Sequence, residues 1–211
     1  MLALRLNAGL RHRLGKPMWF TLALLPFAWL IYAALFDRLG ANPAEALVRA
    51  TGDWTLRMLC IVLAITPLRV GWGLQSLAGY RRMAGLFVYF YVMLHLSSYA
   101  WFDMGFDLAD IGNDIVKRPF ILVGFSAALL LTPLALTSFN RAIRYMGAQR
   151  WQRLHRLVYL VAVLAILHFF WMRAGKNNFA EVAVYAAVLA CLLGWRVLRR
   201  LRTARARALA A

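Results

Sequence analysis

Three histidines interrupt the apolar segments of this chain, and their positions are the first pointer to chemistry. His95 lies within GLFVYFYVMLHLSSY, and His155 and His168 lie near the two ends of RWQRLHRLVYLVAVLAILHFFW. An imidazole inside an apolar segment is unfavourable unless it faces the protein interior and has a partner there. Each is therefore a candidate ligand, and the alternative for each is a hydrogen-bonded side chain that only packs. The fourth histidine, His12, precedes the first apolar segment and is expected at the surface.

The segments that hold these histidines are typical of membrane-spanning helices. Of the 211 residues, 63% are hydrophobic and only 16% are charged, which is more apolar than a soluble domain of this size requires. A helix needs roughly 20 apolar residues to cross ~30 Å of hydrocarbon. The sequence predicts an all-α membrane protein, a single domain in which short connections join six transmembrane helices into one bundle. The predicted spans are 18–36, 54–70, 83–102, 119–138, 154–172 and 179–195.

The distribution of charge predicts that both termini are cytoplasmic. Basic residues gather at the N-terminus, in 69–82, in 141–156 and in the C-terminal tail, which share one side of the six spans. The positive-inside rule places that side in the cytoplasm. All eight acidic residues fall on or near the other side. Topology and lipid contact explain most of the net charge of +17, so no nucleic-acid partner is expected.

His95 and His168 are expected at similar depth in the membrane. They lie toward the outer ends of the third and fifth spans, which cross the bilayer in the same direction. Two neutral imidazoles that face each other across a bundle can be the axial ligands of a haem iron. The surrounding aromatic residues suit a haem pocket, but they equally suit the aromatic belt of a membrane protein. The matched depth carries the prediction that His95 and His168 bind haem iron.

His155 is expected at the opposite membrane face. It precedes His168 by thirteen residues, a helical rise of ~20 Å, and on an ideal helix the two side chains would point ~140° apart. A local distortion would be needed before both could serve one stack of cofactors. Three interpretations stay open: an interfacial residue, the ligand of a second haem, or part of an inner site where electrons enter. Four arginines are candidates to contact haem propionates, a flavin phosphate or a quinone carbonyl there: Arg81, Arg82, Arg150 and Arg153.

Seven motifs spread over nearly the whole chain resemble one known family. They are LLPF (24–27), ITPLR (65–69), RRMAGL (81–86), HLSSY (95–99), KRPF (117–120), LALTS (134–138) and GAQRWQRLHRLVY (147–159) followed by His168. Together they resemble the MsrQ family, formerly called YedZ, of haem-binding membrane subunits of the periplasmic protein-methionine-sulfoxide reductase system. That family is part of the ferric-reductase-like transmembrane superfamily, which includes the NADPH oxidases.

The resemblance implies a bacterial inner-membrane electron carrier. Members take electrons from membrane quinol and pass them through b-type haem to a periplasmic molybdopterin-containing reductase, with which they form a heterodimer, and they are associated with FMN. A cytosolic flavin reductase is an alternative donor. The spacing of His155 and His168 is familiar in the superfamily, but the NADPH oxidases carry two histidines in the third span where this chain has only His95. A second haem would therefore lack one of its usual ligands.

Two other functions stay open at this point. A ferric or other metal reductase of the same superfamily would use the same haem and a different acceptor. A haem-free small transporter or assembly factor would use its histidines for packing or proton relay, although the sequence shows no inverted repeat of the kind common in transporters. The favoured prediction is a non-catalytic electron-transfer subunit of an oxidoreductase complex.

Overall fold

The computed structural model describes residues 2–175 and 177–209, and in this range it contains helices and no strand. The helices are α1 (Leu2–Arg11), α2 (Gly15–Leu35), α3 (Pro43–Gly71), the 3₁₀ helix η1 (Gln75–Tyr80), α4 (Arg81–Phe102), α5 (Leu108–Lys117), α6 (Pro119–Leu136), α7 (Asn140–Met146), α8 (Ala148–His155), α9 (Val158–Ala174) and α10 (Ala180–Leu209). Counting η1 with α4 and α8 with α9, six helical segments are long and apolar enough to cross a membrane. The predicted six-helix transmembrane fold is confirmed.

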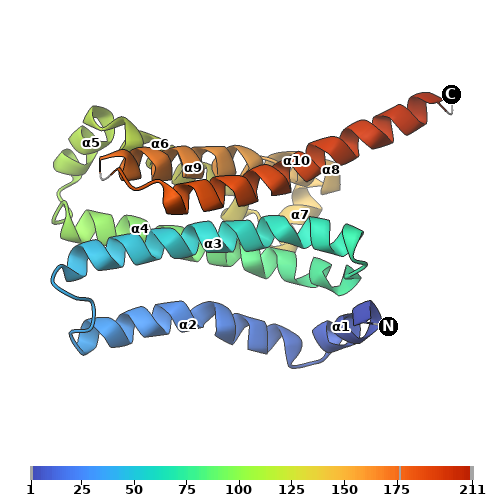
Figure 1. Ribbon diagram of the computed structural model, residues 1–211, viewed down its shortest axis with the longest axis horizontal. Coiled ribbons are helices and arrows are strands. Elements are labelled where there is room, and N and C mark those ends of the chain that lie inside the picture. Colours follow the sequence, from blue (N-terminus) through green and yellow to red (C-terminus); the bar gives the residue numbers. More distant parts are fainter. Residues whose placement is uncertain (1, 176, 210–211) are drawn as a thin grey trace.

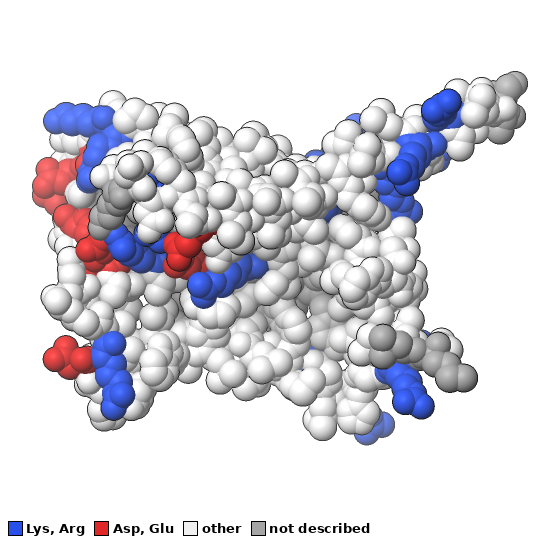
Figure 2. Space-filling model, in the orientation of Figure 1, with Lys and Arg blue, Asp and Glu red and all other residues white. Residues whose placement is uncertain are grey.

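The bundle has two chemically different ends. Figure 1 shows α5 at one end, and α1, α7 and both chain termini at the other. Figure 2 shows the acidic side chains near the α5 end, whereas only basic ones are visible near the termini. These are called the acidic end and the basic end below. Both termini share one end, as the predicted topology requires, and their cytoplasmic location stays a prediction.

Two helices extend well beyond their predicted spans because polar turns prolong them outside the apolar segment. α3 begins at Pro43 rather than at 54, since the Asn42 side chain caps it by accepting a hydrogen bond from the Glu45 amide at 3.2 Å. α10 continues to Leu209 rather than ending near 195, and its last part is rich in arginine and exposed. Figure 1 shows this part projecting beyond the bundle at the basic end.

The centre of the bundle is built from α3, α4, α6 and α9. α3 lies along α4, α6 lies along α9, and α10 rests against α3 and α9 (Figure 1). The largest fully buried side chains come from three of these helices: Leu59, Val88, Tyr91 and Val161. Ala84 and Ala162 are also fully buried, because small residues let helices approach closely in a membrane bundle. This core holds the two outer histidines.

The fifth span is broken directly after His155. α8 ends at His155 and α9 begins at Val158, and the connection uses short i→i−3 bonds from the Arg156, Leu157 and Tyr159 amides at 3.2, 3.0 and 3.0 Å. Residues in such a turn advance by about 120° rather than 100°. The break therefore rotates His155 relative to an ideal helix, so the ideal-helix angle of ~140° between His155 and His168 does not apply.

Candidate functional site

A cavity of about 330 Å³ lies between α3, α4, α6 and α9, and both His95 and His168 line it. Its volume is within the range of about 300–1,000 Å³ that is usual for ligand sites. The walls are mostly aliphatic and include Leu59, Val88, Leu131 and Val161. Only toward the acidic end does the lining become charged. The two imidazoles therefore lie among mostly apolar side chains, and the charged part of the lining is at the acidic end.

His95 extends from α4 and is held against α3. Its Nδ1 lies 2.9 Å from the Val48 carbonyl oxygen and 3.5 Å from the Thr51 hydroxyl. A carbonyl oxygen can only accept, so the proton of this neutral imidazole is on Nδ1 and the lone pair is on Nε2. Gly52 makes the approach of the ring feasible, because a Cβ there would lie 3.1 Å from the His95 Cε1.

His168 extends from α9 and is held against α6 in the same way. Its Nδ1 lies 2.7 Å from the Phe120 carbonyl oxygen, which again leaves the lone pair on Nε2. The ring lies over Gly124, where a Cβ would be 2.7 Å from Nδ1 and 2.9 Å from Cε1. Only glycine fits below this imidazole without a shift of the ring.

The two imidazoles are placed as a pair that could hold one metal ion. Their ring centroids are 6.2 Å apart and the ring planes are inclined by 75°. A metal–imidazole bond is about 2 Å long, so two imidazoles on opposite sides of one metal have centroids roughly 6 Å apart. Metal-binding histidines commonly donate their other N–H to a backbone carbonyl, as both do here.

A metal at this pair would need ligands from outside the protein. Among the described residues no group of three or more His, Cys, Asp or Glu side chains is placed to hold a metal ion. A tetrahedral protein-only site is therefore absent from that part of the chain. A haem supplies four equatorial nitrogens and needs only two axial ligands, so the residues present fit a haem.

Two arginines lie at the mouth of the cavity, toward the acidic end. Arg49 pairs with Glu45 at 2.5 Å, and Arg118 pairs with both oxygens of Asp114. The Tyr99 hydroxyl donates to the same Asp114 carboxylate at 2.5 Å. Burial alone would raise the pKa of Asp114, but the hydrogen bonds from Arg118 and Tyr99 outweigh it, and the pKa lies below its ordinary value. Nearby Asp103 shows the opposite shift, because burial raises its pKa.

His155 lies outside this cavity, at the basic end. Its Nδ1 is 3.1 Å from the Trp151 carbonyl oxygen, and its ring stacks on the Trp151 indole with centroids 3.8 Å apart. Its Nε2 is buried and has no hydrogen bond of acceptable geometry among the described residues, although the Leu134 carbonyl lies nearby. A buried polar atom without a partner is uncommon in native proteins.

The four candidate arginines do not converge on His155. Arg81 is the one that acts electrostatically on the imidazole. Arg82 instead donates to the Asn140 side chain at 2.7 Å, and Arg150 and Arg153 are exposed. None of the four lines the cavity of His95 and His168.

A known protein family matches the region of the chain that contains most of this site. A family model described as "Ferric reductase like transmembrane component" matches residues 48–166, more than half of the chain. A protein of Polaromonas naphthalenivorans (strain CJ2), named "Protein-methionine-sulfoxide reductase heme-binding subunit MsrQ", is 71% identical, with 94% of this chain and 90% of the relative covered. The chain belongs to the MsrQ family.

More distant relatives carry the same name. The MsrQ protein of Herminiimonas arsenicoxydans is 52% identical over 86% of this chain and 84% of its own length. The MsrQ protein of Xanthomonas campestris pv. campestris (strain B100) is 48% identical over 80% of this chain and 76% of its own length. No solved structure matches the chain. The region matched by the family model includes His95 and His155 but ends before His168. The assignment of His168 to the site therefore rests on the position of its ring, whose centroid is 6.2 Å from that of His95.

Several residues of the site were not found from the sequence. The Val48 and Phe120 carbonyls leave no signal, because every residue has a carbonyl. Arg49 and Arg118 could have been found, since each follows an acidic residue by four positions in a helix near the outer side. Arg196 was also missed; at the basic end it donates to the Leu63 carbonyl and lies over the Tyr159 ring.

Proposed function

We propose that this chain is a membrane electron carrier in which His95 and His168 hold one b-type haem. Electrons would come from membrane quinol and leave to a periplasmic molybdopterin reductase that repairs methionine sulfoxide in envelope proteins. The observation that supports this most is the histidine pair itself. Each ring is anchored through Nδ1 to a carbonyl of a neighbouring helix, in an apolar cavity, with centroids 6.2 Å apart.

The protein residues have three tasks in this proposal. His95 and His168 would hold the iron through Nε2, and the carbonyls of Val48 and Phe120 would fix the orientation and raise the basicity of the rings. The aliphatic walls exclude water. When bound, haem supplies reversible one-electron chemistry. Arg49 and Arg118 are placed at the mouth of the cavity to pair with the haem carboxylates, a role that the sequence had given to arginines of the basic end.

We place the site where electrons enter around His155. The buried Nε2 without a hydrogen bond is the group best placed there to bind a quinol hydroxyl or an additional haem, and the charge of Arg81 acts on the same imidazole. Replacement of His155 by alanine should slow quinol-driven haem reduction and leave the spectrum of the outer haem intact. FMN remains an implication of the family resemblance, and flavin fluorescence of denatured purified protein tests it.

The names of the relatives favour sulfoxide repair over the metal-reductase alternative. The family model alone would suit a ferric reductase, because both functions share the haem and differ in the acceptor. The relatives at 48–71% identity are named as subunits of a protein-methionine-sulfoxide reductase. A periplasmic reductase of that system is therefore the proposed partner, and the exposed acidic end is the surface available to it.

The decisive experiment is the visible spectrum of detergent-purified protein, oxidised and then reduced by dithionite. We expect low-spin b-type bands with about one haem per chain at the outer site, and loss of these bands in His95→Ala and in His168→Ala. His12→Ala is the matched control, because His12 is exposed and lies outside both sites. A folded wild-type protein that stays colourless and takes up no added haem would refute the proposal.

A further inference from the structure

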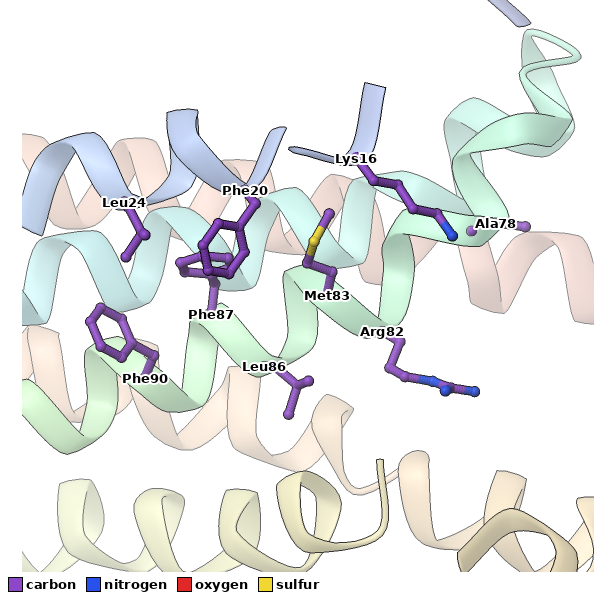
Figure 3. A pocket seen from close by; sticks show the side chains of 10 residues that line it. Lys16, Phe20, Leu24, Ala78, Arg82, Met83, Leu86, Phe87 and Phe90 are labelled. Carbon is purple, nitrogen blue, oxygen red and sulfur yellow. The ribbon is translucent and has the colours of Figure 1, made fainter. Parts of the chain in front are cut away.

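A second cavity, of about 680 Å³, lies between α2 and α4 and belongs to neither histidine site. Figure 3 shows its long apolar wall and a cationic end formed by Lys16 and Arg82. The apolar part is lined by Phe20, Leu24, Met83, Leu86, Phe87 and Phe90. This cavity is called the α2–α4 cleft below. Its shape combines a hydrocarbon groove with a positively charged end.

The α2–α4 cleft is a built feature, because α2 is fixed to its neighbours at defined points. The Tyr91 hydroxyl donates to the Ala23 carbonyl of α2 at 2.7 Å. The Tyr80 hydroxyl donates to the Leu10 carbonyl of α1 at 2.6 Å and lies directly against Gly15, the first residue of α2. Aromatic side chains also connect α2 with α4: the rings of Phe20 and Phe87 meet edge to face, with centroids 5.3 Å apart. Between these contacts the two helices stay apart, and Phe20 and Leu86 are 47% and 41% exposed.

The cationic end carries charge that no acid compensates. Arg82 is oriented by its bond to Asn140 at 2.7 Å, which uses one of its five N–H donors. The Lys16 side chain runs past Gly79, where an added Cβ would lie 3.7 Å from Cε. Neither residue forms an ion pair among the described residues, and the residues that line the α2–α4 cleft include no acid. The site is thus complementary to an anion.

We propose that the α2–α4 cleft binds one anionic phospholipid from the leaflet around the basic end. Its phosphate would lie on Lys16 and Arg82, which are the second residues of α2 and α4, on the side of the basic end. One acyl chain would run along Phe87 toward Leu24 and Phe90. The bound lipid would fill the space between α2 and α4 and so tie α2 to the bundle.

The chemistry of the lining disfavours a quinol at this position. Oxidation of a quinol releases protons, and a site for it needs a group that accepts them. The residues that line the α2–α4 cleft include no histidine and no carboxylate. A quinone also has no charge to match the two cations that line the α2–α4 cleft. A small free anion would gain nothing from the apolar wall.

The test is native mass spectrometry of the full-length protein in detergent with dioleoylphosphatidylglycerol. Dioleoylphosphatidylcholine, which has the same chains and no net charge, is the comparison lipid. We expect one phosphatidylglycerol per chain, and affinity about 30-fold lower in the double variant Lys16→Gln/Arg82→Gln. Arg13→Gln/Arg144→Gln is the matched control, since both arginines are exposed near the basic end outside the α2–α4 cleft, and it should bind like wild type. Circular dichroism and gel filtration verify that each variant is folded.

A third variant tests the apolar wall without changing charge. Leu86→Trp should fill the α2–α4 cleft and weaken phosphatidylglycerol binding while both cations remain. Unchanged binding in the double variant, or equal binding of both lipids, would overturn the proposal. Competition by inorganic phosphate would identify a plain anion site, and displacement by ubiquinone would identify a quinone site; either result also overturns it.

Discussion

Gly52 and Gly124 set how closely each imidazole approaches the neighbouring helix. A methyl group at Gly124 would lie 2.7 Å from the His168 Nδ1, so the ring would have to leave the Phe120 carbonyl. We expect Gly124→Ala to weaken haem binding about tenfold, as is usual when the partner of a metal-binding histidine is disturbed. Gly52→Ala should have a smaller effect, because the contact there is 3.1 Å. Haem per chain and the low-spin bands are the measurements.

Gly85→Ala is the control for these substitutions. Gly85 is also in a helix, and a Cβ there would meet only a Val62 methyl group at 4.0 Å. Alanine should be accepted and even stabilise α4 slightly. Equal haem content in Gly124→Ala and Gly85→Ala would show that the close approach at Gly124 has no role in ligation.

Arg49 and Arg118 should influence the reduction potential of the haem. A cation near the iron disfavours the oxidised state, which carries the additional positive charge, so its removal lowers the potential. For charges ~10 Å apart the effect is on the order of 50 mV. We expect Arg49→Gln and Arg118→Gln to lower the midpoint potential, measured by redox titration of purified protein, and to hold haem less firmly. Arg150→Gln, an exposed arginine that does not line the cavity, should leave the potential unchanged; an equal shift there would contradict the assignment.

The sequence predicted the histidine pair because depth in a membrane follows from position along a span. It predicted neither the carbonyl partners nor the glycines, since these depend on which turns of two helices meet. The candidate arginines were chosen by depth alone, and depth does not determine direction. Arg82 accordingly extends toward α7 and the α2–α4 cleft, and Arg150 and Arg153 are exposed.

Among the elements, α5 depends on a small charged network at its two ends. Asp107 caps it by accepting from the Ala109 and Asp110 amides at 2.8 and 3.0 Å, and Asp114 joins it to Tyr99 and Arg118. The pKa of Asp114 is lowered in the folded protein, so this stabilisation is complete above the ordinary value of 3.8 and is lost as pH falls below it.

Asp114→Asn should therefore destabilise the protein at neutral pH and make little difference in acid. The network is partly exposed, so we expect about 1 kcal/mol or less, seen as a decrease of a few degrees in the thermal midpoint. The pKa of Asp103 is raised mainly by burial, which both proteins share, and to a lesser extent by the Asp114 charge, which the variant lacks. A gap between the two proteins that persists well below pH 3.8 would mean that Asp114 acts through packing rather than charge.

The break between α8 and α9 shows where prediction by periodicity ends. Hydropathy gave one continuous span through His155, because Leu154, Leu157 and Val158 are all apolar. The structure ends α8 at His155 and places a tight turn at Arg156 and Leu157. Neither residue is a proline or a glycine, so no local signal marks the turn. The Trp151 indole donates to the Thr137 carbonyl at 2.9 Å, and this contact fixes the orientation of α8 relative to α9.

The molecule as a whole separates its charges, and that asymmetry gives each end a different task. The basic end would face anionic lipid in the cytoplasmic leaflet, and the acidic end would face the periplasm. At the acidic end α5 exposes apolar as well as acidic residues, with Leu108 and Val116 82% and 78% exposed. An exposed amphipathic helix near the mouth of the haem cavity is a suitable contact for a soluble redox partner.

Neutralising Asp110 tests this docking surface. Asp110 is exposed on α5 and its side chain neither caps the helix nor lines the haem cavity. We expect Asp110→Asn to slow electron transfer from the haem to the periplasmic reductase a few-fold at low ionic strength, and the difference should shrink above ~0.1 M salt because surface charges mainly steer encounter. Asp37→Asn is the control. Asp37 is an exposed acid in the connection after α2, and its backbone has a left-handed conformation that asparagine also tolerates. Stopped-flow oxidation of the reduced haem by the partner measures both, and equal rates for the two variants would place the docking surface away from α5.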